Sequence, residues 1–134
     1  MRRLTTSLGV SAILIWQAPA SAATPEETLY RWGECAIASG VYRALVKEGT
    51  KNPIILKGHE DFERVVPKVE QHTNTLARTL GSEASRAIQT RMFVDYDARL
   101  NAIWDVEDSA AIAVKTFGPI LDRCLIEAAA LPKA

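Results

Sequence analysis

The stretch that decides the fold is SEASRAIQTRMFVDYDARLNAIWDVEDSAAIAVKTFGPILDRCLIEAAAL, residues 82–131. Apolar residues recur along it at steps of three or four, and this spacing places them on one face of an α-helix. The apolar stripe consists of Ile88, Met92, Tyr96, Leu100, Ile103, Val106, Ala110, Val114, Phe117, Leu121, Leu125 and Ala128. Only Gly118-Pro119 interrupts the pattern, and a kink is expected there. The second half of the chain is therefore predicted to be helical and to pack one face against other helices.

Residues 1–22 have the three parts of a secretory signal peptide. Two arginines precede an apolar run at residues 8–16, and residues 20–22 are the small Ala-Ser-Ala at which a signal peptidase cuts. We therefore expect Sec export, cleavage before Ala23 and a periplasmic or secreted mature protein. Because the apolar run is shorter than the ~20 residues that span a bilayer, no membrane anchor is expected.

The remainder, residues 23–134, is the length of one small domain with a single hydrophobic core. The whole chain has 16 basic and 16 acidic residues, so loss of Arg2 and Arg3 with the signal peptide would leave it slightly acidic. No basic patch remains in the sequence to indicate binding to nucleic acid or to anionic lipid.

The first predicted helix has a clear start and a clear end. Thr24 is the expected N-cap, Pro25 occupies the first helical position, and Glu27 completes a capping box with Thr24. Gly49 is expected to stop the helix after about Glu48. Apolar residues on adjoining faces predict burial on more than one side, and the main inward face is Leu29, Trp32, Ala36, Ser39, Tyr42 and Val46.

Residues 50–58 are expected to form a connection, because Asn-Pro favours a turn and Gly58 weakens a helix. The three apolar residues at 54–56 are predicted to cover one end of the core. The second helix should then run to Leu80, with either a kink at Pro67 or a restart of the helix near Val66, because proline has no N–H for the carbonyl four residues earlier.

The two cysteines decide where the third helix is expected to end. An even number of cysteines in an exported protein indicates a disulfide. A third helix that ends near Asp105 brings Cys124 of a descending fourth helix beside Cys35, whereas one that continues to Phe117 leaves them ~25 Å or more apart. We therefore predict an all-α, antiparallel, up-down-up-down four-helix bundle with a Cys35–Cys124 disulfide. A third helix continuing to Phe117 remains the alternative.

One possible partner-binding face is acidic. Asp97, Asn101, Asp105 and Asp108 follow one another at helical steps and would form a line on a continuous helix. Such a line suits a basic partner protein or a loosely held calcium ion, while the ordinary alternative is a solvated helix face. A turn near Asp105 would break the line.

No metal or cofactor site is predicted. His59 and His72, the only histidines, would lie on different faces of one helix, and His59 with Glu63 supplies too few ligands for zinc. Met92 with His72 could ligate haem in principle, but Met92 belongs to the apolar stripe. We expect His59 at the surface and His72 at the edge of the core. No histidine has a serine or acid pattern that predicts nucleophilic catalysis.

These features predict an exported, non-catalytic helical protein that binds another protein, as an inhibitor, immunity factor or stress-protective factor. A cysteine in the first helix and one in the last, on a small exported domain, broadly resembles periplasmic immunity and inhibitor proteins. The alternative is a periplasmic carrier of a small ligand or metal in the bundle core, which needs a cavity lined by polar groups such as His72 or Tyr96. An exposed apolar or acidic patch would favour protein binding.

Overall fold

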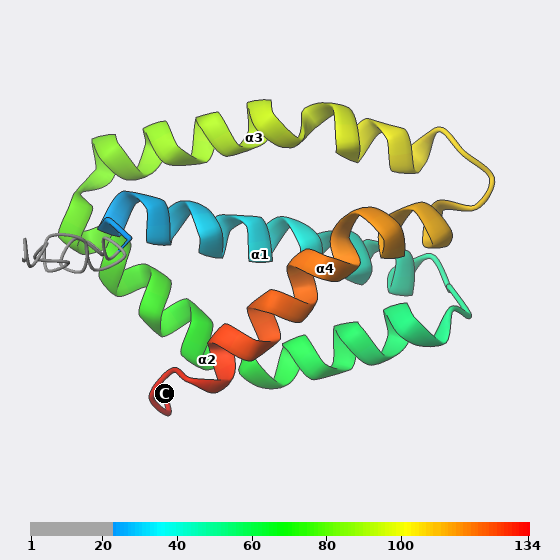
Figure 1. Cartoon of the computed structure of the whole chain (residues 1–134), viewed down its shortest axis with the longest axis horizontal. Helices are drawn as coiled ribbons and strands as arrows, with labels where there is room; N and C mark the ends of the chain where they lie inside the picture. Colours follow the sequence, from blue (N-terminus) through cyan, green and yellow to red (C-terminus); the bar gives the residue numbers. More distant parts are fainter. Residues whose placement is uncertain (1–22) are drawn as a thin grey trace, which may run out of the picture.

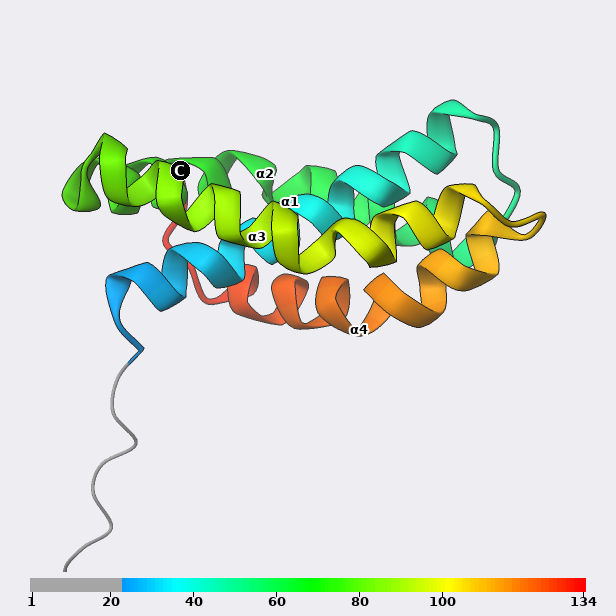
Figure 2. The ribbon, with the colours of Figure 1, turned by 90° about the horizontal axis from the view of Figure 1, so that it is seen from above.

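The computed structural model describes residues 23–134 as a bundle of four helices without strands over that range. The helices are α1 Pro25–Lys47, α2 Pro53–Leu80, α3 Ser82–Trp104 and α4 Ser109–Ala129. They run alternately up and down (Figure 1), and both the α1–α2 connection and the α3–α4 turn lie at the same end (Figure 2). The predicted all-α antiparallel bundle is confirmed. The predicted signal peptide, residues 1–22, lies outside the described residues.

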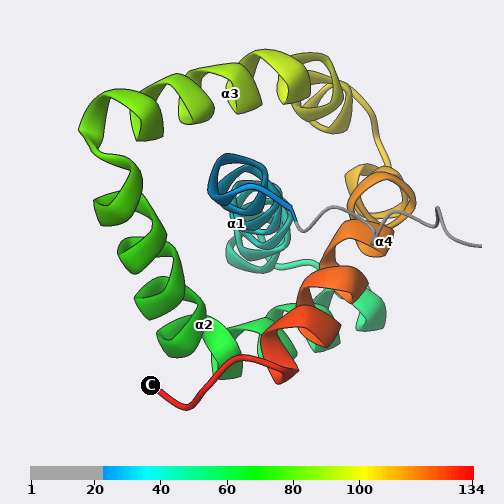
Figure 3. The ribbon, with the colours of Figure 1, turned by 60° about the vertical axis from the view of Figure 1, so that its left-hand side comes forward.

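Helix α1 occupies the centre of the bundle. Figure 3 shows α2, α3 and α4 arranged around it, and α1 contacts all three. Its buried residues, Trp32, Cys35, Ile37, Ala38, Ser39, Val41, Tyr42 and Leu45, cover more than one side of the helix, as the two adjoining apolar faces predicted. Ala36 was expected to point inward but is exposed, because α2 and α3 do not close over this part of α1.

The ends of α1 follow the sequence prediction. The Thr24 hydroxyl accepts a hydrogen bond from the Glu27 N–H at 3.1 Å, and the Thr24 N–H donates to the Glu27 carboxylate at 3.4 Å. This reciprocal pair is the predicted capping box. Glu48 ends the helix, and Gly49 follows with a φ of 86°, a conformation that glycine adopts without strain.

Helix α2 begins earlier than predicted, at Pro53. The Asn52 side chain accepts hydrogen bonds from the N–H groups of Ile54 and Ile55, at 3.0 and 3.3 Å, and therefore caps the helix there. The expected connection over residues 50–58 was wrong, because this cap outweighs the weakening effect of Gly58. Of the apolar tripeptide, only Ile55 is buried in the core, whereas Ile54 and Leu56 are exposed.

Pro67 lies inside α2, which continues through it without interruption. Figure 1 shows the helix changing direction near the middle of its length, which is where Pro67 falls in the sequence. The predicted kink is therefore present, and it bends α2 around the rest of the bundle.

Helix α3 ends at Trp104, and residues 105–108 form the turn that the disulfide argument predicted. The Asp108 carboxylate caps α4 by accepting the Ala111 N–H at 3.0 Å, and the Ser109 hydroxyl donates to the Ile103 carbonyl at 2.8 Å. Helix α4 then continues through Gly118 and Pro119. None of the four helices over residues 23–134 is long and apolar enough to cross a membrane.

Candidate functional site

The disulfide between Cys35 and Cys124 joins the central helix α1 to α4. The two Cα atoms are 5.8 Å apart although 89 residues separate them in the sequence, and both side chains are fully buried. The predicted bridge is confirmed, and with it the end of α3 near Asp105.

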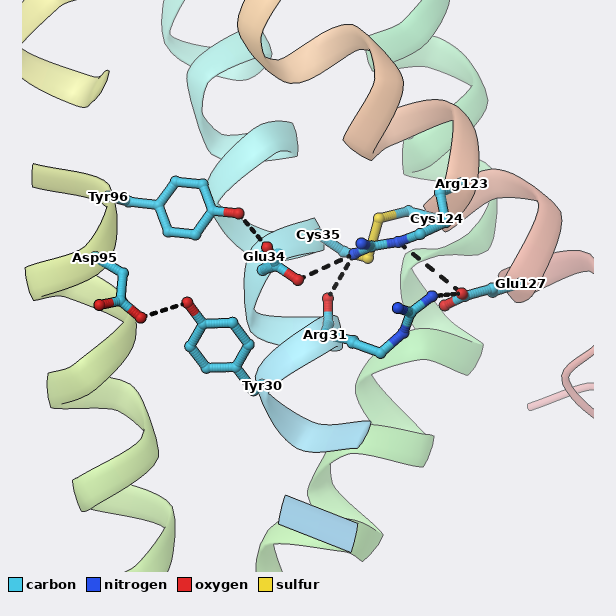
Figure 4. A network of polar contacts seen from close by, with 9 residues as sticks. All are labelled: Tyr30, Arg31, Glu34, Cys35, Asp95, Tyr96, Arg123, Cys124 and Glu127. Atoms are coloured by element: carbon cyan, nitrogen blue, oxygen red, sulfur yellow. Dashed lines mark hydrogen bonds and ion pairs between the residues drawn. A yellow bond between two sulfur atoms is a disulfide. The ribbon is translucent and has the colours of Figure 1, made fainter. Parts of the chain in front are cut away.

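A polar network surrounds this disulfide (Figure 4). Glu34, next to Cys35, accepts a hydrogen bond from the Tyr96 hydroxyl of α3 and lies 3.5 Å from the guanidinium of Arg123, next to Cys124. Its side chain is only 16% exposed. One carboxylate on α1 therefore contacts both α3 and α4 beside the covalent link.

The network extends through Arg123 along α4. Its guanidinium also donates to the Arg31 carbonyl at 3.3 Å, and its Nε lies 3.9 Å from the Glu127 carboxylate. Arg31 forms an ion pair with the same carboxylate. The two arginines and the two glutamates balance in charge, so this network attracts neither anions nor cations strongly and serves to hold the helices together.

Two tyrosines at the α1–α3 contact carry raised pKa values. Burial and the hydrogen bond to Asp95, 2.6 Å long, raise the pKa of Tyr30 to about 12. Burial and the hydrogen bond to Glu34 raise the pKa of Tyr96 to about 12. Both phenols are therefore protonated at neutral pH and act as hydrogen-bond donors that bind α3 to α1.

The acidic line predicted from the sequence is divided by the α3–α4 turn. Asp97 and Asn101 share a face of α3, where the Asn101 amide donates to the Asp97 carboxylate at 3.4 Å. Asp105 stands at the end of α3, and Asp108 is occupied in capping α4. All four residues are exposed, but they do not form one continuous helical line.

The two histidines contact different residues. His59 is half-buried, and its Nδ1 atom lies 3.9 Å from the Glu63 carboxylate. His72 packs edge-on against Trp32 with 5.8 Å between ring centres, which places it at the core edge as predicted. Among residues 23–134, no three His, Cys, Asp or Glu side chains converge in a way that could hold a metal ion.

An apolar groove runs along α1 beside α3, and we call it the α1–α3 groove. It consists of two adjoining cavities of about 290 and about 360 Å³, which share Ala36, Gln89 and Met92. The larger cavity is lined also by Ile37, Gly40, Val41, Phe93, Leu100 and Trp104. Phe93 is 51% exposed and Trp104 is 44% exposed, so two aromatic side chains edge the groove.

The sequence carried a signal for this groove that the stripe analysis missed. Phe93 lies seven residues before Leu100 and Trp104 four residues after it, so these two aromatic residues widen the apolar stripe of α3 on the side of Leu100. Gly40 and Ala36 on α1 have small side chains, so the groove is deeper where they line it.

The chain matches no protein-family model, no curated protein and no solved structure.

Proposed function

We propose that this is an exported, non-catalytic protein, periplasmic or secreted, that acts by binding another protein through the α1–α3 groove. The observation that supports binding is the exposed apolar lining of the groove, edged by Phe93 and Trp104. Exposed aromatic side chains beside an apolar hollow are typical of protein-binding surfaces. Export is supported by the predicted signal peptide and by the disulfide.

The shape of the groove suits a helix of the partner. Its walls are helices, and its floor includes Ala36 and Gly40, where an added side-chain atom on Gly40 would meet nothing within 4 Å. An incoming helix can therefore approach α1 closely and pack at the ~8–10 Å interaxial distance of helix pairs. Its apolar residues would contact Phe93, Leu100 and Trp104 in the helix-in-groove mode of recognition.

The carboxylates beside the groove can form ion pairs with a partner helix that carries basic residues. Asp97 lies four residues after Phe93 and three before Leu100, so it shares their side of α3. Glu70 lies three residues before Thr73 and seven before Ala77, which line the groove from α2. Several carboxylates of α2, α3 and the α3–α4 turn form no ion pair within the described part of the chain: Glu70, Asp97, Asp105, Glu107 and Asp108.

Lysine or arginine on both edges of an apolar helix face would complement these carboxylates. The partner segment that suits the groove is therefore an amphipathic helix with an apolar face and basic flanks. Of the four residues of the predicted acidic line, Asp97 shares the groove side of α3 and Asp105 follows Trp104 at the end of that helix, whereas Asp108 caps α4.

The test compares capture of partners from periplasmic extract by three tagged proteins: wild type, the double variant Phe93→Ser/Trp104→Ser, and Ile126→Ser. Ile126 is 74% exposed on α4 and lines neither part of the groove, so it is the matched control for loss of surface apolar area. We expect the groove variant to retain at least about 10-fold less of a partner that wild type and Ile126→Ser both hold.

Salt dependence tests the charge argument on the same captured partner. Raising the salt concentration from about 50 to about 300 mM should weaken the complex, because it screens the attraction between exposed charges. Equal capture by the groove variant, or binding that salt leaves unchanged, would contradict this function. Circular dichroism of each variant checks that its helices are intact.

A further inference from the structure

A buried tyrosine on α1 has a hydroxyl group without a hydrogen bond. Tyr42 is 1% exposed, and its ring packs so closely on α2 that a Cβ atom at Gly58 would stand 2.7 Å from it. No residue from 23 to 134 forms a hydrogen bond with its hydroxyl. The hydroxyl oxygen itself is not fully buried, so it is open to a hydrogen bond from solvent or from a ligand.

Tyr42 lines a cavity of about 400 Å³ together with residues of α2 and α4. We call it the Tyr42 cavity; it shares no lining residue with the α1–α3 groove. A Cβ atom at Gly118 would lie 3.5 Å from the hydroxyl oxygen, which locates that oxygen beside α4. The apolar walls are Ile54, Val114, Pro119, Leu121 and Leu125.

The polar part of the lining carries more negative than positive charge. Lys57 forms an ion pair with Asp61 at 2.9 Å, and Arg64 also approaches Asp61, at 4.0 Å. Asp122 lines the same cavity as Tyr42 and has no ion pair within residues 23–134. Burial raises the pKa of Tyr42, and the negative charge of Asp122 raises it further.

The site therefore presents a hydroxyl and an unpaired carboxylate beside apolar walls, and this combination favours a donor with positive charge.

We propose that the Tyr42 cavity binds a small primary amine with an apolar body. Its ammonium group donates to the Tyr42 hydroxyl oxygen and pairs with Asp122, while its apolar part contacts Ile54, Val114 and Pro119. An anion would meet the charge of Asp122, and a neutral molecule would leave that carboxylate without a counter-charge. This site lies outside the groove, so it goes beyond the proposed protein-binding function and does not depend on it.

The experiment titrates the protein with 2-phenylethylammonium and records the amide signals by two-dimensional NMR. Gly58 and Gly118 line the cavity on α2 and α4, and glycine amides fall in a separate region of the spectrum. Two probes of the same shape are the controls, neutral 2-phenylethanol and anionic phenylacetate. We expect the amine to shift both glycine signals and to bind at least about 10-fold more tightly than either control.

Two variants then locate the amine. Asp122→Asn and Tyr42→Phe should each weaken binding by about 5-fold or more, because each removes one partner of the ammonium group. The matched control Tyr30→Phe removes a hydroxyl that already has a partner, Asp95, and should leave amine binding unchanged.

Asp122 is exposed, so its variant retains the fold even if Tyr42→Phe does not. The proposal is overturned if the amine leaves the Gly58 and Gly118 signals in place, if phenylacetate binds as well as the amine, or if Asp122→Asn has no effect. Any of these results would mean that the Tyr42 hydroxyl is satisfied by solvent alone.

Discussion

The Tyr96 hydroxyl on α3 donates a hydrogen bond to the carboxylate of Glu34, the residue that precedes Cys35 on α1. Arg123, the residue that precedes Cys124 on α4, approaches the same carboxylate at 3.5 Å. The residues that flank the disulfide therefore extend the link between α1 and α4 to include α3 (Figure 4).

Replacing Tyr96 with phenylalanine should destabilise the protein more than the same replacement of Tyr30. In Tyr96→Phe, the nearly buried Glu34 carboxylate loses a donor, which should lower the free energy of unfolding by ~1–3 kcal/mol. The control is Tyr30→Phe, whose acceptor Asp95 is exposed to water, so its loss should be below ~1 kcal/mol. Urea unfolding measures both, and equal losses would show that Glu34 does not need the donor.

The same two tyrosines predict how stability depends on alkaline pH. Their folded pKa of about 12 is above the ordinary value of 10.0, so the unfolded chain loses these protons first as the pH rises. Their contribution is complete below pH 10 and is lost between about pH 10 and about pH 12. Urea unfolding at intervals across this pH range should show the free energy of unfolding falling as the pH rises. In the double variant Tyr30→Phe/Tyr96→Phe this free energy should fall less steeply with pH.

Two glycines inside helices should respond in opposite directions to the same substitution. Gly58→Ala places a methyl group 2.7 Å from the Tyr42 ring and 3.1 Å from Leu121, and should destabilise by ~1–3 kcal/mol. Gly40→Ala meets no atom within 4 Å and should stabilise the helix by ~0.5–1 kcal/mol. Thermal unfolding compares the two, and a stabilised Gly58→Ala would contradict the close packing of α2 against α1.

Features that depend on residues close in sequence, or on one covalent constraint, were predictable. Thr24 and Glu27 are three residues apart, and their capping box formed as expected. The turn after Trp104 has no glycine or proline, but the Cys35–Cys124 bridge required the chain to reverse there.

Features that depend on contacts between distant residues were not predictable. The sequence rule predicts that Gly58 weakens a helix, and only the position of Tyr42 explains why a glycine is needed inside α2. Tyr30 and Asp95 are 65 residues apart, so no spacing rule joins them. The groove also escaped prediction, because periodicity placed Ala36 on the inward face without showing that α2 and α3 leave it open.

Reduction of the disulfide should lower stability without unfolding the protein. The bridge closes a long loop and mainly restricts the unfolded chain, so its loss should cost up to ~4 kcal/mol. Helicity at room temperature should persist, because the hydrophobic core remains. Circular dichroism melts with and without reductant test this, and Cys35→Ser/Cys124→Ser should not respond to reductant. A helical signal lost at room temperature would show that the core alone cannot hold the bundle.

The central claim is that a partner helix with an apolar face and basic flanks lies in the α1–α3 groove. Site-specific photo-crosslinking from residue 93 in cells tests it, with residue 126 on α4, which is more exposed than residue 93, as the control position. We predict a crosslink from position 93 only, and mass spectrometry should map it to a partner segment that is amphipathic, helical and net basic. A crosslink at position 126 but not at 93, or one to an acidic or non-helical segment, would contradict the claim.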